Sequence, residues 1–228
     1  MNSHMGFEEM RARLIRNLIS QGILRDERVI KAMAAVPREE FIPGSQREQA
    51  YIDAPLQIGC GQTISAPHMI AIMCQELDLK PGQKVLEIGT GSGYHVAVTA
   101  ETLSTERGSP RNRVFSLEIV KELIDFAMDN LQRTGYGDRV EVVEADGSQG
   151  YMKEKPFDRI YATAAPPSVP QPLIDQLKPG GILIIPVGET GFFQELLKIV
   201  KKSPTEISTA RLGGVAFVPM RGRYGFRS

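Results

Sequence analysis

Residues 85–94 read VLEIGTGSGY, an apolar run that meets an acidic residue and then glycines at three alternate positions. A buried parallel strand that ends in such a turn brings bare backbone close to a ligand, because glycine lacks the Cβ that would keep the ligand away. The stretch therefore predicts a strand, a tight turn and a ligand site at the carboxyl edge of a sheet.

Downstream of this turn, strand-like and helix-like segments alternate. Strands are expected over 84–88, 113–117, 140–144, 159–163, 181–187, 193–201 and 215–220, and helices over 94–104, 120–134 and 172–177. The last two strands are expected to form a hairpin. The βαβ alternation predicts an α/β fold with a doubly wound, seven-stranded, mostly parallel sheet and helices on both faces.

Upstream of the turn, the sequence predicts an N-terminal helical extension. Residues 7–36 have helical apolar spacing, interrupted at Gly22, and Asp26 is expected to cap the second helix. The segment from Pro37 to Gly61 is expected to be irregular, and a connection of that length is often functional.

A further helix is expected after this loop, with Ser65 as its N-cap and Pro67 in its first turn. We expect residues 7–61 to form helices and a loop that cover the active site. Residues 62–228 are expected to form the catalytic α/β domain as one compact unit.

The composition is that of an ordinary globular protein of 228 residues, with 27 basic and 27 acidic side chains and a formal net charge of zero. Zero net charge argues against a non-specific nucleic-acid binder. No apolar run reaches about 18 residues, so no membrane span is expected. Met1 and Met5 are both candidate starts of the native chain.

The two cysteines, Cys60 and Cys74, are expected to be reduced thiols of a cytoplasmic protein. With histidines only at positions 4, 68 and 95, no metal-ligand cluster is expected. A monomer is expected.

The glycine spacing bears on the identity of the ligand. Dinucleotide folds use G-x-G-x-x-G to hold a pyrophosphate, whereas Gly89, Gly91 and Gly93 form G-x-G-x-G, with Tyr94 where the last glycine would stand. Glu87 would repel a pyrophosphate but suits a cation. This combination resembles motif I of the class I S-adenosylmethionine (SAM) methyltransferases, a Rossmann-like fold.

Acidic residues after the next two strands support this resemblance. Glu118 can accept both ribose hydroxyls of a nucleoside, and in SAM enzymes an acid at the position of Asp146 meets the adenine amino group. The residues expected to bind SAM are Gln62, Ile64, Glu87, Gly89, Thr90, Gly91, Ser92, Gly93, Glu118, Ile119, Asp146 and Gly147.

The methyl acceptor is a separate question, because one fold carries many chemistries. Enzymes that methylate DNA amino groups place an Asp, Asn or Ser before Pro-Pro-aromatic after the fourth strand, whereas residues 165–168 read APPS. Base-carbon methylation needs a cysteine nucleophile after that strand, and Cys60 and Cys74 both precede motif I.

The distinctive segment reads YIDAPL at 51–56 and GCGQTISAPHM at 59–69. It resembles the signature of protein-L-isoaspartate O-methyltransferases, and the similarity extends from about residue 8 to 220, including VPREEFIP at 36–43 and FVPM at 217–220. The resemblance implies transfer of the SAM methyl group to the free α-carboxylate of L-isoaspartyl residues in damaged proteins and peptides. S-adenosylhomocysteine (SAH) would be the product.

The resemblance places the active-site serine of that family on Ser65. Thr63 is a second hydroxyl donor, and the backbone N–H groups at the following helix start are expected to help orient the acceptor carboxylate. His68 is expected to be structural or at the edge of the cofactor, and His95 to be a packing residue. Ile70 departs from the family, which often has a polar side chain there.

The tail around Arg221, Arg223 and Tyr224 either lines a peptide channel or, more simply, is solvated. Two other functions remain open at this point: another class I methyltransferase, acting on a small molecule or nucleic acid, and a non-catalytic SAM-binding protein. An NAD-dependent oxidoreductase is a more distant alternative.

Overall fold

The structure is a computed structural model that describes residues 6–104, 113–189 and 193–226. Its helices are α1 (Phe7–Ser20), α2 (Glu27–Ala35), α3 (Pro67–Glu76), α4 (Tyr94–Thr102), α5 (Lys121–Arg133) and α6 (Gln171–Asp175). Its strands are β1 (Leu56–Gly59), β2 (Gln62–Ile64), β3 (Lys84–Ile88), β4 (Arg113–Glu118), β5 (Val140–Glu144), β6 (Phe157–Ala162), β7 (Leu177–Val187), β8 (Gln194–Lys201) and β9 (Ile207–Val215). The two candidate starts, Met1 and Met5, lie outside the described residues.

In the described part of the chain, seven strands form one sheet in the order β5-β4-β3-β6-β7-β8-β9. Strands β3 to β7 are parallel, and β8 and β9 are antiparallel to their neighbours. The predicted doubly wound fold is confirmed. The strand order reverses between β3 and β6, and in such sheets a ligand crevice lies beyond the carboxyl ends of the strands at this point.

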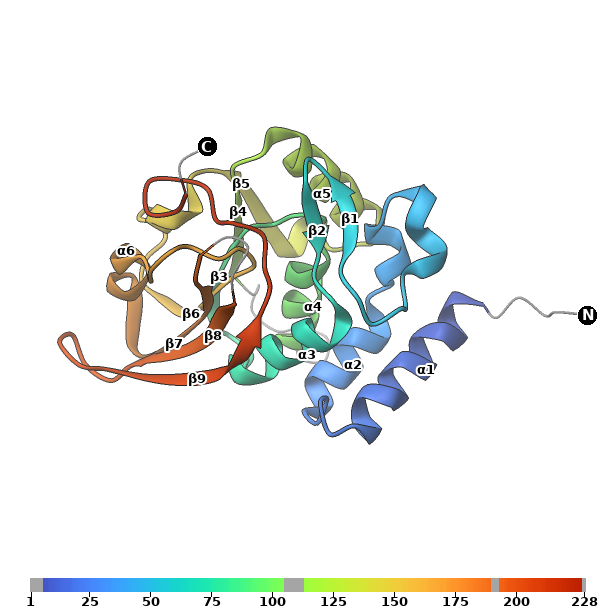
Figure 1. The fold of residues 1–228 in the computed structure, drawn as a ribbon, viewed down its shortest axis with the longest axis horizontal. Helices are drawn as coiled ribbons and strands as arrows, with labels where there is room; N and C mark the ends of the chain where they lie inside the picture. The colour runs from blue at the N-terminus through green and yellow to red at the C-terminus, as the bar shows by residue number, and fades with distance from the viewer. Residues whose placement is uncertain (1–5, 105–112, 190–192, 227–228) are drawn as a thin grey trace, which may run out of the picture.

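Alternate side chains of the central strands enter two separate cores. Val85 and Tyr161 belong to a core that also contains residues of α1 to α5. Their neighbours Leu86 and Ile160 belong to the core on the other face, with Leu173 of α6. Figure 1 shows α1 and α2 on one side of the molecule, with α3, α4 and the β1–β2 hairpin between them and the strands of the main sheet.

The N-terminal helices follow the predicted signals. Gly22 adopts a left-handed φ of 70° just after α1, which ends that helix. The Asp26 carboxylate accepts the backbone N–H groups of Arg28 (2.8 Å) and Val29 (3.4 Å), so it caps α2 as expected.

Three local predictions were wrong. The segment predicted to be irregular contains two short 3-10 helices, Arg38–Phe41 and Gly44–Gln49, and strand β1, which pairs with β2. Ser65 is not the N-cap of α3, because the helix starts one residue later, with Ala66 as N-cap and Pro67 at its first position.

The last strand was predicted over 215–220 but runs from Ile207 to Val215. Gly213 and Gly214 lie inside this strand, and glycines weaken the strand signal in a sequence. The segment after Val215 leaves the hairpin: the backbone N–H of Ala165 donates to the Val218 carbonyl at 2.8 Å, so this segment crosses to the end of β6.

Within the described ranges, no helix combines the length and the apolar character needed to cross a membrane.

Candidate active site

The glycine turn after β3 has the backbone that only glycine adopts easily. Gly89, Gly91 and Gly93 have φ values of 93°, 55° and 87°. The Thr163 hydroxyl, at the end of β6, donates to the Gly89 carbonyl at 2.7 Å. A Cβ on Gly89 would collide with that hydroxyl, so the turn and the end of β6 fit together only with glycine there.

Glu118 ties this turn to the loop after β4. One carboxylate oxygen accepts the Gly91 N–H at 3.0 Å, and the other accepts the N–H groups of Ile119 at 2.9 Å and Val120 at 3.0 Å. These bonds hold an acidic group at the carboxyl end of β4, beside the turn.

A cavity lies over this edge of the sheet, and its wall contains Gly89, Gly91, Glu118, Ile119 and Gly147. We call it the cofactor cavity. Strand β2 covers it with Gln62 and Thr63, and the C-terminal segment covers it with Pro219, Met220 and Arg221. A Cβ on Gly147 would lie 2.5 Å from Ile88 Cγ2, so close packing also demands glycine there.

The cofactor cavity measures 70 Å³. Small-molecule sites typically measure roughly 300–1,000 Å³. The cavity in this structure is therefore smaller than a typical small-molecule site.

Other residues expected to bind SAM lie off this wall. Ile64, Thr90 and Ser92 are buried, and Gly93 is the N-cap of α4. The Ser92 carbonyl accepts a hydrogen bond from Asn130 Nδ2 at 3.0 Å.

Glu87 lies beneath the glycine turn, fully buried. The Ser116 hydroxyl donates to its Oε2 and lies 2.6 Å from the Thr90 hydroxyl, whereas Glu87 Oε1 has no hydrogen-bond partner among the described residues. Burial raises the pKa of Glu87 to about 8 despite the bond from Ser116. The group is thus a mostly neutral acid at neutral pH that supports the turn from below.

Asp146 is occupied by its own loop and by the C-terminal tail. Its Oδ1 accepts from the N–H and the hydroxyl of Ser148, at 3.0 and 2.6 Å. Its Oδ2 accepts from Gln149 Nε2 at 3.0 Å and from the Arg223 N–H at 2.8 Å. Burial opposes the charge, but the bonds from Ser148, Arg223 and Gln149 outweigh it and lower the pKa of Asp146.

The backbone of the tail is therefore anchored, whereas the side chains of Arg221, Arg223 and Tyr224 are exposed, in line with the simpler expectation of a solvated tail. Besides the Arg223 contact, the Tyr224 N–H donates to the Ser148 hydroxyl at 3.0 Å, and Arg221 borders the cofactor cavity. No local sequence pattern predicts these contacts, because 77 residues separate Asp146 from Arg223.

A second cavity of 810 Å³ adjoins the first, between the start of α3 and the ends of β8 and β9. We call it the acceptor cleft. Ser65, His68 and Met69 lie on one wall, and Phe193 and Phe217 lie on the other. Thr63, Thr163 and Val218 border both cavities.

His68 and the start of α3 are held by Asp53. The Asp53 carboxylate accepts the His68 backbone N–H and lies 2.9 Å from the ring Nδ1. One of the helix N–H groups expected to face the acceptor is thus already bonded. Ile70 is fully buried in the core, so it faces neither cavity.

His95 is a packing residue, as predicted. Its buried ring lies 4.5 Å from the Tyr161 ring, between centroids, and its Nε2 lies 3.5 Å from Cys74 Sγ. Burial lowers the pKa of His95 to about 3, so the ring is neutral. Cys74 and the exposed Cys60 are free thiols.

Comparison with known proteins identifies the family. The family profile "Protein-L-isoaspartate(D-aspartate) O-methyltransferase (PCMT)" matches residues 9–225. The protein-L-isoaspartate O-methyltransferase of Hyperthermus butylicus is 50% identical over 223 residues, 97% of this chain and 92% of that protein. The enzyme of the same name from Methanopyrus kandleri is 51% identical over 221 residues, 97% of this chain and 95% of its own.

Solved structures agree. A putative protein-L-isoaspartate O-methyltransferase from Plasmodium falciparum, in complex with SAH, superposes with a TM-score of 0.80 and 32% identity, over 92% of this chain and 98% of that one. A second protein-L-isoaspartate O-methyltransferase gives a TM-score of 0.82 and 29% identity, over 94% of this chain and 67% of that one. The chain therefore belongs to the protein-L-isoaspartate O-methyltransferases, SAM-dependent enzymes of protein repair.

Proposed function

We propose that this chain performs the family reaction where its two cavities meet, with Thr63 and Ser65 presenting the acceptor carboxylate to the methyl group. The observation that carries the proposal is that Thr63, Thr163 and Val218 border both cavities, which therefore adjoin at these residues. A methyl donor in one cavity and a carboxylate in the other would come into direct contact where the two cavities adjoin, beside these three residues.

The chemistry demands little of the protein beyond placement. A free α-carboxylate has a reference pKa of about 3.3–3.7, so it is already an anion at neutral pH and needs no general base. SAM supplies an electrophilic methyl group on a sulfonium, which needs no activation by a side chain. The carboxylate oxygen forms a bond to the methyl carbon as the carbon–sulfur bond breaks, giving a methyl ester and SAH.

The contribution of the chain is therefore alignment and the exclusion of water. Holding two reactants in line is worth several kcal/mol of barrier. The hydroxyls of Thr63 and Ser65 are suited to hold the carboxylate. Ser65 is not needed as the cap of α3, since Ala66 has that position.

The cofactor residues fit a nucleoside better than a pyrophosphate. Gly89, Gly91 and Gly147 leave bare backbone on the wall, and Glu118 places a carboxylate where it can accept ribose hydroxyls. Each oxygen of Asp146 already accepts two bonds, so an adenine amino group at this position must replace one of them. Glu87 would act through the turn rather than by contact.

Labelled SAM and two matched peptides test the proposal, one with L-isoaspartate and one with aspartate. We expect base-labile label on the isoaspartyl peptide alone. In Ser65→Ala, kcat should fall by about 100-fold while the dissociation constant of SAM stays within twofold. Ser45→Ala, a change at an exposed serine on neither cavity wall, is the control. An unchanged kcat in Ser65→Ala would remove Ser65 from the mechanism.

Three further expectations remain proposals. We propose that residues 7–61 cover the active site of the catalytic unit 62–228; this boundary falls in the turn between β1 and β2. We propose that the chain is a monomer, which sedimentation tests. The free cysteines support the expected cytoplasmic location.

A further inference from the structure

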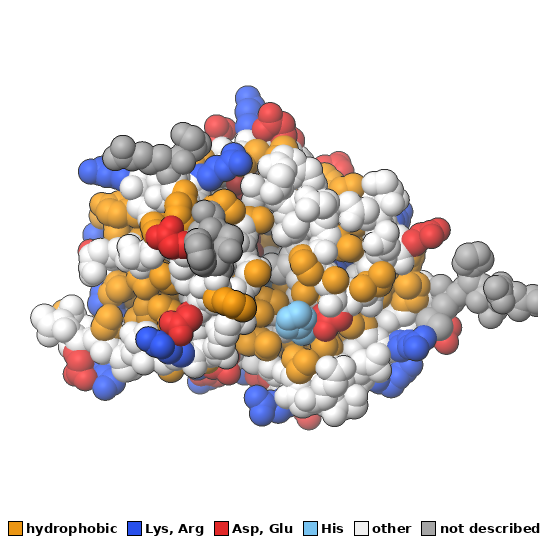
Figure 2. Space-filling model, viewed as in Figure 1, with side chains coloured by type: hydrophobic (Ala, Val, Ile, Leu, Met, Phe, Trp, Pro, Cys, Tyr) orange, Lys and Arg blue, Asp and Glu red, His pale blue; other side chains and the backbone are white. Residues whose placement is uncertain are grey.

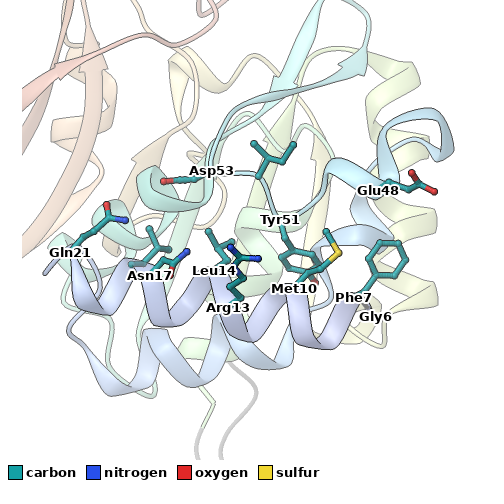
Figure 3. Close-up of a pocket in the computed structure, with 12 residues that line it drawn as sticks. Gly6, Phe7, Met10, Arg13, Leu14, Asn17, Gln21, Glu48, Tyr51 and Asp53 are labelled. Carbon is teal, nitrogen blue, oxygen red and sulfur yellow. The ribbon is translucent and has the colours of Figure 1, made fainter. Parts of the chain in front are cut away.

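Another large groove, of 790 Å³, lies between α1 and residues 48–53. Its α1 side presents Phe7, Met10, Leu14 and Asn17, which are three or four residues apart and thus share one helix face. The opposite side is the segment from Glu48 to Asp53, including Tyr51 and the exposed Ile52. We call it the α1 groove (Figure 3).

The α1 groove and the acceptor cleft adjoin each other through one pair of side chains. Asp53 lines the α1 groove, His68 lines the acceptor cleft, and the Asp53 carboxylate lies 2.9 Å from the His68 ring. Pro55, two residues after Asp53, also borders the cleft. A chain that leaves the cleft over Asp53 therefore enters the groove directly.

We propose that the α1 groove binds the polypeptide that flanks the isoaspartyl residue of the substrate. The inference rests on the acceptor cleft proposed above. The occupant follows from the reaction, because the acceptor is one residue of a longer chain, and that chain must continue out of the cleft. Figure 2 shows apolar side chains on both sides of a partly exposed histidine on this face.

The dimensions of the groove suit a short extended segment. Figure 3 shows Asp53 toward the Asn17 end of the row of α1 side chains and Glu48 beyond the Phe7 end. Ten residues of helix separate Asn17 from Phe7, which at about 1.5 Å each gives about 15 Å. An extended chain covers that length with four or five residues, at about 3.3 Å each.

The side chains that line the α1 groove predict which residues the flanking polypeptide should contain. Met10 and Ile52 offer apolar contacts, whereas charge of both signs is present, from Arg13 on α1 and from Glu48 and Asp53 opposite. Apolar side chains in the flank should therefore improve binding, and net charge should matter little.

The test compares three isoaspartyl peptides. The short one has two residues on each side of the isoaspartate, and the long ones have ten residues, several of them apolar, on one side or the other. For the unmodified enzyme, the KM of at least one long peptide should be about tenfold lower than that of the short peptide. Equal KM values for all of them would overturn the proposal.

A double variant, Met10→Ser with Ile52→Ser, should raise the KM of the long peptide about tenfold and change that of the short peptide by less than twofold. The control is Ile19→Ser with Met128→Ser, which removes exposed side chains of the same kinds from outside the groove. The control should leave both KM values unchanged. Equal changes with both peptides, or in both double variants, would contradict the groove assignment.

A competition experiment needs no variant. A ten-residue apolar peptide without isoaspartate should inhibit methylation of the long peptide and spare that of the short one. Absence of inhibition would count against the groove. If the groove instead bound a second copy of the chain, sedimentation would show a dimer that the Met10/Ile52 variant abolishes, and the proposal would fail. No label on the short peptide would refute the acceptor cleft, a distinguishable result.

Discussion

The replacement Glu87→Gln isolates the energetic effect of a buried acid under the glycine turn. Burial raises the pKa of Glu87 from 4.5 to about 8, so in the folded protein the group stays protonated in a range where the unfolded chain has lost the proton. Between these pH values the folded state binds one more proton than the unfolded state. The free energy of unfolding therefore falls as the pH rises, by about 1.4 kcal/mol per pH unit.

Over the whole range from 4.5 to 8, this effect amounts to about 5 kcal/mol. His95 has the opposite effect at lower pH. Burial lowers the pKa of His95 from 6.5 to about 3, so the unfolded chain binds the extra proton between these values and stability rises with pH. From these two groups, the curve should be flat between pH 4.5 and 6.5 and should fall by about 2 kcal/mol between pH 6.5 and 8.

Urea unfolding at pH 5, 6.5 and 8, without SAM, measures the difference. The unmodified protein should lose about 2 kcal/mol between pH 6.5 and 8, and Glu87→Gln should lose almost none of it. Glu141→Gln removes an exposed carboxylate from β5 and should reproduce the unmodified curve. An equal loss in Glu87→Gln and in the unmodified protein would show that Glu87 is not protonated in the folded state.

Three further changes have expected outcomes. As the pH falls from 6.5 toward 3, the free energy of unfolding measured in urea should decrease less in His95→Leu than in the unmodified protein, because the variant lacks the buried neutral imidazole. An equal decrease in both proteins would contradict a neutral His95. Gly89→Ala should weaken SAM binding at least about tenfold by calorimetry, because its Cβ meets Thr163 at a φ of 93°, an energetic cost of about 1–3 kcal/mol. Gly44→Ala, in open space, is its control. Asp26→Ala should lower the free energy of unfolding by about 1 kcal/mol through the lost cap of α2; an unchanged urea midpoint would show that the cap contributes nothing.

Much of the sheet could be predicted because its signals are local. The expected strand over residues 84–88 matches β3, and the expected strand over 140–144 matches β5. Strand β7 begins at Leu177, earlier than expected, because the chain bulges against β6 around Gly180, where φ is 78°. Strand β9 was misplaced because the glycines inside it weaken the strand signal, and the β1–β2 hairpin was missed because its strands are only four and three residues long.

For the candidate site, the sequence located the segments but not the direction of each side chain. The Glu118 carboxylate lies on the cavity wall because the backbone N–H groups of Gly91, Ile119 and Val120 donate hydrogen bonds to it. Glu87 points into the protein instead, where Ser116 binds it. The sequence did not predict Thr163 as a site residue, although it borders both cavities. Its position depends on a hydrogen bond to the Gly89 carbonyl, 74 residues away in the sequence.

The three residues that border both cavities have a consequence for kinetics. Thr63, Thr163 and Val218 each border both cavities, so on the proposed assignment a substitution at any of them should change the apparent affinities for SAM and for the peptide together. A change at Glu118 should affect only the affinity for SAM, and a change at Phe193 only that for the peptide, because each residue borders one cavity. An analogue of SAM with a bulkier transferable group would need more space beside Thr63, Thr163 and Val218. Smaller side chains at these positions would also change which acceptors fit the cleft.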